Sequence, residues 1–210
     1  MFKIKQKIEN INMKIKDNKL TVAIFGATEP LGLALAKALS KGPYRLLLLS
    51  DNTSMLKGLQ SEIINYSWDT DAEAIKSLND THSEADVFIL AAPFSKETEI
   101  VATLKKLAKG KIVISMSNPE KRDLKGRMDA QQSTAMELQK LLPESKVVKA
   151  FSTISLANFK QPAFNGEQVD SFIAGDDESA IKTVDQLVRA AGFNPVILEG
   201  LSSSRKMEEY

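Results

Sequence analysis

A glycine-rich turn near the start of the chain has the residue types needed to bind a diphosphate. It follows the apolar run 20–25 and precedes a segment with helical spacing. A helix N-terminus placed at the end of a parallel strand offers free N–H groups and a favourable dipole to phosphate. We predict that Gly26, Thr28 and Gly32 cradle the pyrophosphate of a dinucleotide. The predicted binding residues of this turn are Gly26, Ala27, Thr28, Glu29, Pro30, Leu31 and Gly32.

The middle of the turn departs from the glycine fingerprint. Read as G-x-x-G-x-x-G, the turn has Gly26 and Gly32 at its outer positions but Glu29 between them. Two like charges about 4 Å apart repel by roughly 1 kcal/mol in water and about 4 kcal/mol at an effective dielectric of 20. Pro30 suits the first helical turn but removes one N–H donor. Two interpretations stay open: a working site, and a degenerate turn that binds dinucleotide weakly or not at all.

The end of the next apolar run supplies a candidate ribose site. Residues 44–49 are followed by Ser50 and Asp51, which we predict to contact the adenosine ribose. A carboxylate at this place accepts a ribose hydroxyl of NAD and repels the extra phosphate of NADP. Asp51 therefore favours NAD, while NADP stays open. The alternative for Asp51 is a turn residue that only caps the following helix.

Later strand ends should complete the crevice. Ala92 and Pro93 follow the run 86–91, and Asn118 and Thr153 lie just beyond the runs 111–115 and 146–151. Carboxyl ends of parallel strands share one edge of a sheet. We therefore predict that the strand ends Ala92-Pro93, Ser117-Asn118 and Ser152-Thr153 line the nicotinamide end of the crevice, where Pro93, Asn118 and Thr153 set the nicotinamide face. The serines 202–204 are either helix caps or donors to a ligand at the sheet edge.

The elements that must position these residues alternate between strand and helix patterns. Short apolar runs alternate with segments whose apolar residues recur at helical spacing. This predicts an α/β fold with a Rossmann-like, doubly wound, mainly parallel sheet and helices on both faces. The predicted strands are 20–25, 44–49, 72–77, 86–91, 111–115, 146–151, 171–174 and 195–198; the predicted helices are one that begins at 30 and ends before Gly42, then 54–65, 96–109, 134–142 and 178–191, and a further start near 202.

Length and composition limit the classes of protein that fit. We divide the 210 residues into an extension, 1–19, and one NAD(P)-binding domain, 20–210. The net charge of +1 gives no electrostatic reason to expect nucleic acid or a membrane as partner. The absence of cysteine excludes disulfides, thiolate metal sites and a cysteine nucleophile, and the single histidine leaves very little room for a histidine-based metal site or triad. We predict neither a metal site nor a catalytic side chain. Lysines interrupt the apolar runs of the extension, so we expect a cytoplasmic protein rather than a secreted one.

Three other features have simpler interpretations. His82 is predicted to be a surface residue in a polar turn. Asp176, Asp177 and Glu178 are predicted to cap a helix and to supply acids to its first turn. The segment 116–133 is long for a loop in a compact domain, so we predict that it is functional.

Motifs along most of the chain resemble a known family. They are the glycine turn, Ala91-Ala92-Pro93, the run 146–151 followed by Thr153, the segment 174–178, and the segment 201–205. Together these resemble NADP-dependent oxidoreductases of the deazaflavin, coenzyme F420-dependent, type. Relatives of that family are the reductase domain of the membrane ferric reductases called STEAP proteins and, more distantly, pyrroline-5-carboxylate reductase.

The resemblance implies hydride transfer between a nicotinamide nucleotide and a flavin-like or deazaflavin-like acceptor, with no side-chain acid or base required. The family often has Ser-Arg-Arg after the second strand to hold a 2′-phosphate, whereas this chain has Ser50-Asp51-Asn52. Family members usually continue into a last helix that packs at a subunit interface, whereas this sequence stops at Tyr210. A homodimer stays open as an expectation.

The functional hypothesis is an NAD(P)-dependent oxidoreductase with a small-molecule hydride acceptor. The first alternative is a non-catalytic nucleotide-binding or sensing module, favoured by Glu29. The second is a reductase acting on an imine, a family that relies on a separate helical dimerisation domain for which this chain has no room.

Overall fold

The computed structural model describes residues 19–66, 70–76, 84–118 and 132–209. His82, nearly all of the predicted extension 1–19, and most of the predicted functional loop 116–133 lie outside these ranges. Within them, no helix has both the length and the apolar character needed to span a membrane.

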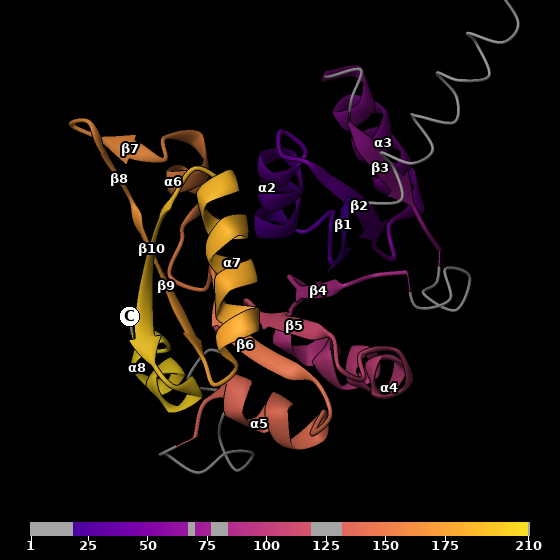
Figure 1. Ribbon diagram of the computed structural model, residues 1–210. Coiled ribbons are helices and arrows are strands. Elements are labelled where there is room, and N and C mark those ends of the chain that lie inside the picture. The colour runs from indigo at the N-terminus through magenta and orange to yellow at the C-terminus, as the bar shows by residue number, and fades with distance from the viewer. Residues whose placement is uncertain (1–18, 67–69, 77–83, 119–131, 210) are drawn as a thin grey trace, which may run out of the picture.

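One eight-stranded sheet organises the described residues (Figure 1). Its strands are β1 (Leu20–Phe25), β2 (Tyr44–Leu49), β3 (Asp71–Ala74), β4 (Val87–Leu90), β5 (Ile112–Ser115), β6 (Lys146–Ala150), β9 (Asp170–Gly175) and β10 (Asn194–Glu199). They lie in the order β10-β9-β6-β5-β4-β1-β2-β3. Strands β1 to β6 pair in parallel, β9 is antiparallel to β6, and β10 is parallel to β9. The prediction of a mainly parallel, doubly wound sheet is confirmed.

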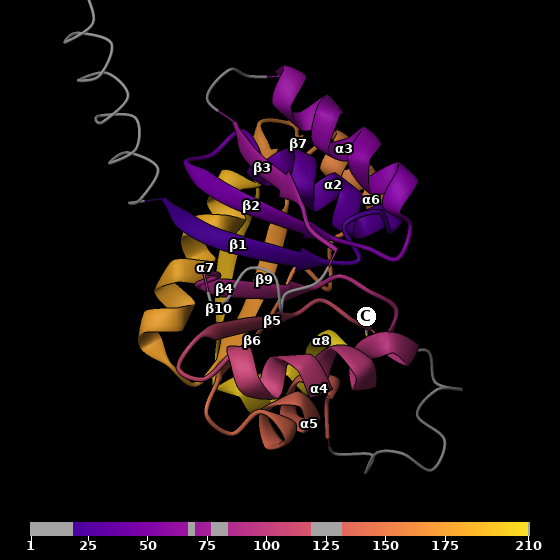
Figure 2. The same ribbon diagram turned by 90° about the vertical axis from the view of Figure 1, so that its right-hand side faces the viewer.

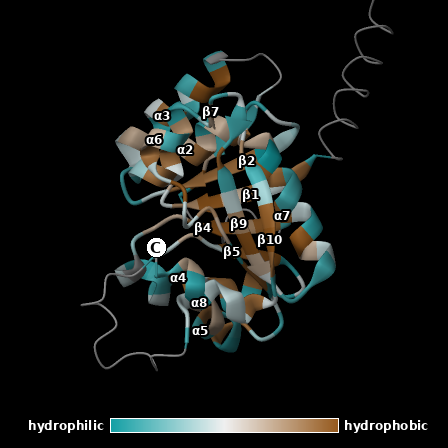
Figure 3. Ribbon diagram, turned by 90° about the vertical axis from the view of Figure 1, so that its left-hand side faces the viewer, coloured by the Kyte–Doolittle hydropathy of each residue, from teal (hydrophilic) through white to brown (hydrophobic). Residues whose placement is uncertain are grey.

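Helices cover both faces of this sheet (Figure 2). The helices are α2 (Pro30–Leu39), α3 (Thr53–Tyr66), α4 (Glu97–Leu107), α5 (Thr134–Leu141), α6 (Leu156–Lys160), α7 (Glu178–Ala190) and α8 (Ser204–Met207), with the 3-10 turns η2 (Phe94–Lys96) and η3 (Leu201–Ser203). Alternate residues of each strand face opposite sides. In β1, Val22 and Ile24 pack with α2, α3 and α7, whereas Ala23 and Phe25 pack with α4 and α5. In Figure 3 the strands are largely brown, and helices such as α7 carry teal residues outward.

The connection after β6 differs from the sequence prediction. It contains α6 and the small hairpin of β7 (Ala163–Phe164) and β8 (Glu167–Gln168). Asn165 and Gly166, both with positive φ, form the turn between these strands, as two-residue hairpin turns require. The sequence pattern predicts no helix or strand between residues 151 and 171. Strands of two residues show no alternation that a sequence pattern can reveal.

The two outer glycines of the first turn are needed for close packing. Gly26 has φ +74°, and a Cβ built there would lie 2.7 Å from the backbone nitrogen of Ala92. A Cβ on Gly32 would lie 2.1 Å from the carbonyl oxygen of Gly26. The turn therefore folds back on α2 and rests against the end of β4, with no room for a side chain at either position.

We expect Gly32→Ala to lower the free energy of unfolding by about 3 kcal/mol, because the new methyl group meets backbone that cannot move aside. Gly58→Ala is the matched control: Gly58 is exposed inside α3, and a Cβ there meets nothing within 4 Å. That change should stabilise the protein by about 0.5–1 kcal/mol. Urea unfolding measures both, and equal effects would contradict the packing argument.

Candidate functional site

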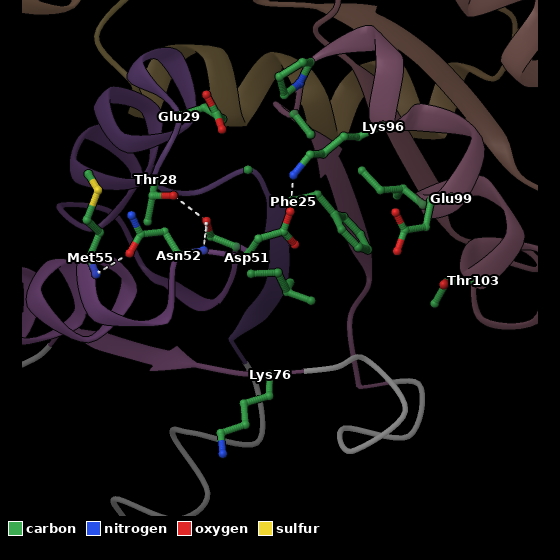
Figure 4. Close-up of a pocket in the computed structure, with 16 residues that line it drawn as sticks. Phe25, Thr28, Glu29, Asp51, Asn52, Met55, Lys76, Lys96, Glu99 and Thr103 are labelled. Carbon is green, nitrogen blue, oxygen red and sulfur yellow. Dashed lines mark hydrogen bonds and ion pairs between the residues drawn. The ribbon is translucent and has the colours of Figure 1, made fainter.

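Two adjoining cavities lie at the carboxyl ends of the parallel strands. The first, of about 500 Å³, lies over the ends of β1, β2 and β4 (Figure 4). The second, of about 380 Å³, lies over the ends of β4, β5 and β6. Both are lined by Glu29, Ala92 and Pro93. Together they form one crevice. It lies over the point where the strand order reverses: β2 and β3 follow on one side of β1, and β4, β5 and β6 on the other.

The glycine turn keeps its anion-binding groups free of the Glu29 carboxylate. The first helical bond of α2 runs from the amide of Leu33 to the carbonyl of Glu29, at 2.8 Å. The amides of Leu31 and Gly32 precede it and have no helical partner, whereas Pro30 has no N–H. The Glu29 side chain caps none of these amides, and in Figure 4 it points away from Thr28. The turn is thus not filled by its own acidic residue.

The hydroxyl groups at the ends of β1 and β2 bond to each other. Thr28 Oγ1 and Ser50 Oγ form a hydrogen bond, and Ser50 Oγ also accepts from the amide of Asn52 at 3.2 Å. The amide of Ala27 donates to the carbonyl of Leu49 at 3.0 Å, which fixes the turn against β2.

Asp51 pairs with a lysine and does not cap α3. The cap is Asn52, whose Oδ1 accepts from the amide of Met55 at 3.1 Å. The capping alternative for Asp51 is therefore wrong. The Asp51 carboxylate forms an ion pair with the ammonium of Lys96, which reaches across the first cavity from η2 (Figure 4). Hydrogen bonding to Asp51 raises the pKa of Lys96, and the charges of Asp51, Glu29 and Glu99 act in the same direction.

The structure brings most of the predicted site residues to this crevice. The first cavity is lined by Gly26, Thr28, Glu29, Ser50, Asp51, Ala92 and Pro93, and the second by Glu29, Pro30, Leu31, Ala92, Pro93 and Asn118. Ala27 and Gly32 are buried behind the turn and line neither cavity. Thr153 lines neither; its neighbour Ser152 does, and the Ser152 carbonyl accepts from Asn118 Nδ2 at 2.7 Å.

Several lining residues were not predicted. In the first cavity they include Met55, Lys76, Lys96 and Ile100. Ser117 and Ser152, which were predicted from their strand ends, line the second cavity. Lys96 and Ile100 come from the helical segment after β4. In the sequence they showed only a helix start and an apolar helix face, so no signal pointed them toward a ligand.

The serines near the end of the described chain bond within the protein. Ser203 donates to the carbonyl of Glu199 at 2.5 Å, and Ser204 is buried and bonds to Ser133 at 2.5 Å. Because β9 reverses direction, β10 ends at the sheet edge opposite the crevice. Neither cavity is lined by the serines 202–204, and neither η3 nor α8 has a side-chain cap hydrogen bond. Asp177 caps α7 as predicted, accepting from Ala180 N at 2.8 Å, and its pKa is lowered to about 2 chiefly by Ser179.

A buried polar cluster supports the wall of the second cavity. The Lys149 ammonium, which is fully buried, contacts the carbonyl of Ser117, the hydroxyl of Thr134 at 3.0 Å and Glu208 Oε1 at 2.7 Å. Glu208 Oε1 also accepts from the amide of Thr134 at 2.9 Å. The cluster thus ties the cavity wall at Ser117 to the start of α5 and to the segment after α8.

Glu97 adds a second buried carboxyl group to this cluster. Its Oε1 is buried and has no hydrogen-bond partner among the described residues. Burial raises the pKa of Glu97; Ser117 and Lys149 oppose that shift, and Glu208 adds to it. Burial likewise lowers the pKa of Lys149, against the opposing effect of Glu208 and Glu97.

Comparison with known proteins identifies relatives of this chain. Residues 21–119 match the model of the family described as NADP oxidoreductase coenzyme F420-dependent. The chain is 28% identical to the F420-dependent NADP reductase of Methanocaldococcus jannaschii over 198 residues, which cover 90% of this chain and 88% of that protein. It is 33% identical to Metalloreductase STEAP3 of Rattus norvegicus over 120 residues, which cover 57% of this chain but only 24% of that protein.

A solved structure agrees on the fold. The crystal structure of a putative F420 dependent NADP-reductase from Arthrobacter sp. FB24 aligns with a TM-score of 0.71 at 19% identity, over 90% of this chain and 88% of the other. The Rossmann-like fold and the resemblance to this NADP-dependent oxidoreductase family are therefore confirmed.

The raised pKa of Glu97 predicts a pH dependence of stability. Its folded-state pKa lies above the ordinary value of 4.5, so the stabilisation linked to its proton is fully present below pH 4.5 and is lost as pH rises through the folded pKa. We expect Glu97→Gln to become more stable relative to the wild type as pH rises, by at most about 1.4 kcal/mol per pH unit.

Urea unfolding at a series of pH values measures this difference. Glu144→Gln is the control, because Glu144 is an exposed partner of Lys109, and its difference should stay within about 1 kcal/mol of zero. A difference for Glu97→Gln that does not change with pH would show that the carboxyl group is ionised in the folded protein.

Proposed function

We propose that this relative of the F420-dependent NADP oxidoreductases binds a nicotinamide dinucleotide and transfers hydride between it and a flavin-like or deazaflavin-like acceptor. The observation that carries the proposal is the pair of adjoining cavities at the carboxyl edge of the sheet. Ligands of open α/β sheets bind at this edge, where the strand order reverses. Here the reversal falls between β1 and β4, directly below Ala92 and Pro93.

The first cavity fits the adenosine diphosphate half of the nucleotide. The start of α2 borders this cavity through Thr28 and Glu29, and the amide of Leu31, which has no helical partner, lies where the second cavity adjoins it. A pyrophosphate favours such a helix N-terminus. Gly26 lets the turn lie directly against the end of β4, because a Cβ there would collide with the backbone of Ala92. Ser50 and Asp51 lie at the end of β2, where Rossmann-type folds hold the adenosine ribose.

The second cavity fits the nicotinamide and its acceptor. Its walls include the apolar side chains of Leu31, Leu90 and Met116, which suit the face of a planar ring. Asn118 is held by the Ser152 carbonyl and presents a polar group at one side. The bound nucleotide supplies the hydride; the residues of the chain orient the two rings.

One observation favours the non-catalytic alternative. Glu29 lines both cavities and stands at their junction, where a dinucleotide carries its negative charge. If Glu29 excludes the pyrophosphate, the protein is a degenerate nucleotide-binding or sensing module. The experiments below separate the two functions.

Nucleotide binding should be limited by the charge of Glu29. We expect NADPH or NADH to bind the wild type with micromolar Kd, and Glu29→Gln to bind about tenfold more tightly, because it removes the repulsion and keeps the shape. Glu29→Gly removes bulk as well and should bind at least as tightly as Glu29→Gln. Fluorescence titration measures each Kd. Binding seen only in the variants would support the degenerate module.

Turnover identifies the acceptor. With NADPH or NADH present, we expect the protein to reduce free flavin or a deazaflavin. The loss of absorbance of the reduced nicotinamide measures this reaction. The same mixture without protein is the control for spontaneous transfer. Tight nucleotide binding without turnover on either acceptor would reject the proposed enzyme and leave the sensing module.

A further inference from the structure

A cation stands at the ribose end of the first cavity, and it comes from an unexpected element. In Rossmann-type folds, an acidic residue after the second strand marks the place of the ribose 2′ oxygen, and a nearby cation accommodates a 2′-phosphate. Asp51 occupies that place at the end of β2. The ammonium of Lys96 is ion-paired with the Asp51 carboxylate (Figure 4), so it lies beside the residue that marks the place of the 2′ oxygen in such folds.

We propose that Lys96 binds the 2′-phosphate of NADP and so sets the nucleotide specificity of the crevice. This inference rests on the proposed function and names the residue that reads the nucleotide. On binding, the phosphate takes the place of the Asp51 carboxylate on the Lys96 ammonium. The carboxylate turns outward to solvent.

The exchange is sterically simple and costs little. The Asp51 side chain is 82% exposed and that of Lys96 is 47% exposed, and ion pairs at such exposure contribute little to stability. The backbone of Lys96 is fixed, because its amide donates to the carbonyl of Pro93 at 2.9 Å. Pro93 itself lines both cavities, so the cation is carried by the same short turn that separates the two halves of the crevice.

The charges around the cavity make Lys96 decisive. The lining residues include three carboxylates, Glu29, Asp51 and Glu99, and two lysines, Lys76 and Lys96. In Figure 4 the ammonium of Lys76 points away from Asp51, at the far end of the view. Without Lys96, a 2′-phosphate would face a carboxylate alone. With it, NADP is accepted although the residue after Ser50 is acidic.

The assignment explains how a chain without the family's arginine pair could keep NADP. Asn52 stands where the family has the second arginine. Its side chain caps α3 by accepting a hydrogen bond from the amide of Met55. Neither Asp51 nor Asn52 can supply a positive charge. Lys96 supplies it from η2, on the opposite wall of the cavity.

The test compares Kd values for NADPH and NADH in the wild type and three variants. We expect Lys96→Gln to raise the Kd for NADPH at least tenfold and the Kd for NADH less than twofold. Asp51→Asn should tighten NADPH severalfold, because the competing carboxylate is gone, and this gain cannot arise from misfolding. Lys76→Gln is the matched control, since it removes the same charge from the same cavity but away from Asp51.

Each outcome decides the question. Equal weakening of NADPH and NADH by Lys96→Gln, or equal weakening of NADPH by Lys96→Gln and Lys76→Gln, would overturn the assignment while leaving the proposed function standing. No tightening of NADPH by Asp51→Asn would also overturn it. Failure of the wild type to bind either nucleotide would instead reject the proposed function, and the role of Lys96 with it. Thermal unfolding of each variant confirms that it is folded.

Discussion

The close contact between the first turn and the end of β4 is the constraint on which the crevice depends. Gly26 and Gly32 leave no space for a side chain, so the turn rests directly on the backbone at Ala91 and Ala92. This contact brings the start of α2 beside the residues that follow β4. One element can therefore offer amide groups to a phosphate while the next separates the two halves of the crevice.

Charge at the crevice is balanced across elements that lie far apart in the sequence. Glu29 follows β1, Asp51 follows β2, and Lys96 precedes α4, yet all three line one cavity. Taken singly, an acidic residue at either of these two places would repel the phosphate expected there. In the structure Lys96 pairs with Asp51. Glu29 is the N-cap residue of α2, but its side chain makes no cap hydrogen bond.

The second half of the crevice depends on a buried polar cluster below it. Lys149 uses its three donors on Ser117, Thr134 and Glu208, so a charge in the core is fully hydrogen-bonded. Removing one charged partner of such a group leaves an unpaired charge in the core, which is strongly destabilising. The wall at Ser117 is thus held by residues that never reach the cavity, which couples the packing of α5 and the segment after α8 to the shape of the site.

The sequence by itself determined the fold class, most strand and helix positions, and the loops that meet at the crevice, because these follow from local periodicity and from the rule that parallel strands end at one edge. It also indicated Gly26 and Gly32, for which the structure shows a packing role. It could not show that Lys96 faces Asp51, that Asn52 is the cap, or that Ser152 rather than Thr153 lines the cavity. Only the tertiary structure decided these points, because a side chain's partner across a sheet depends on strand order and on the exact turn of each loop, and neither leaves a pattern along the chain.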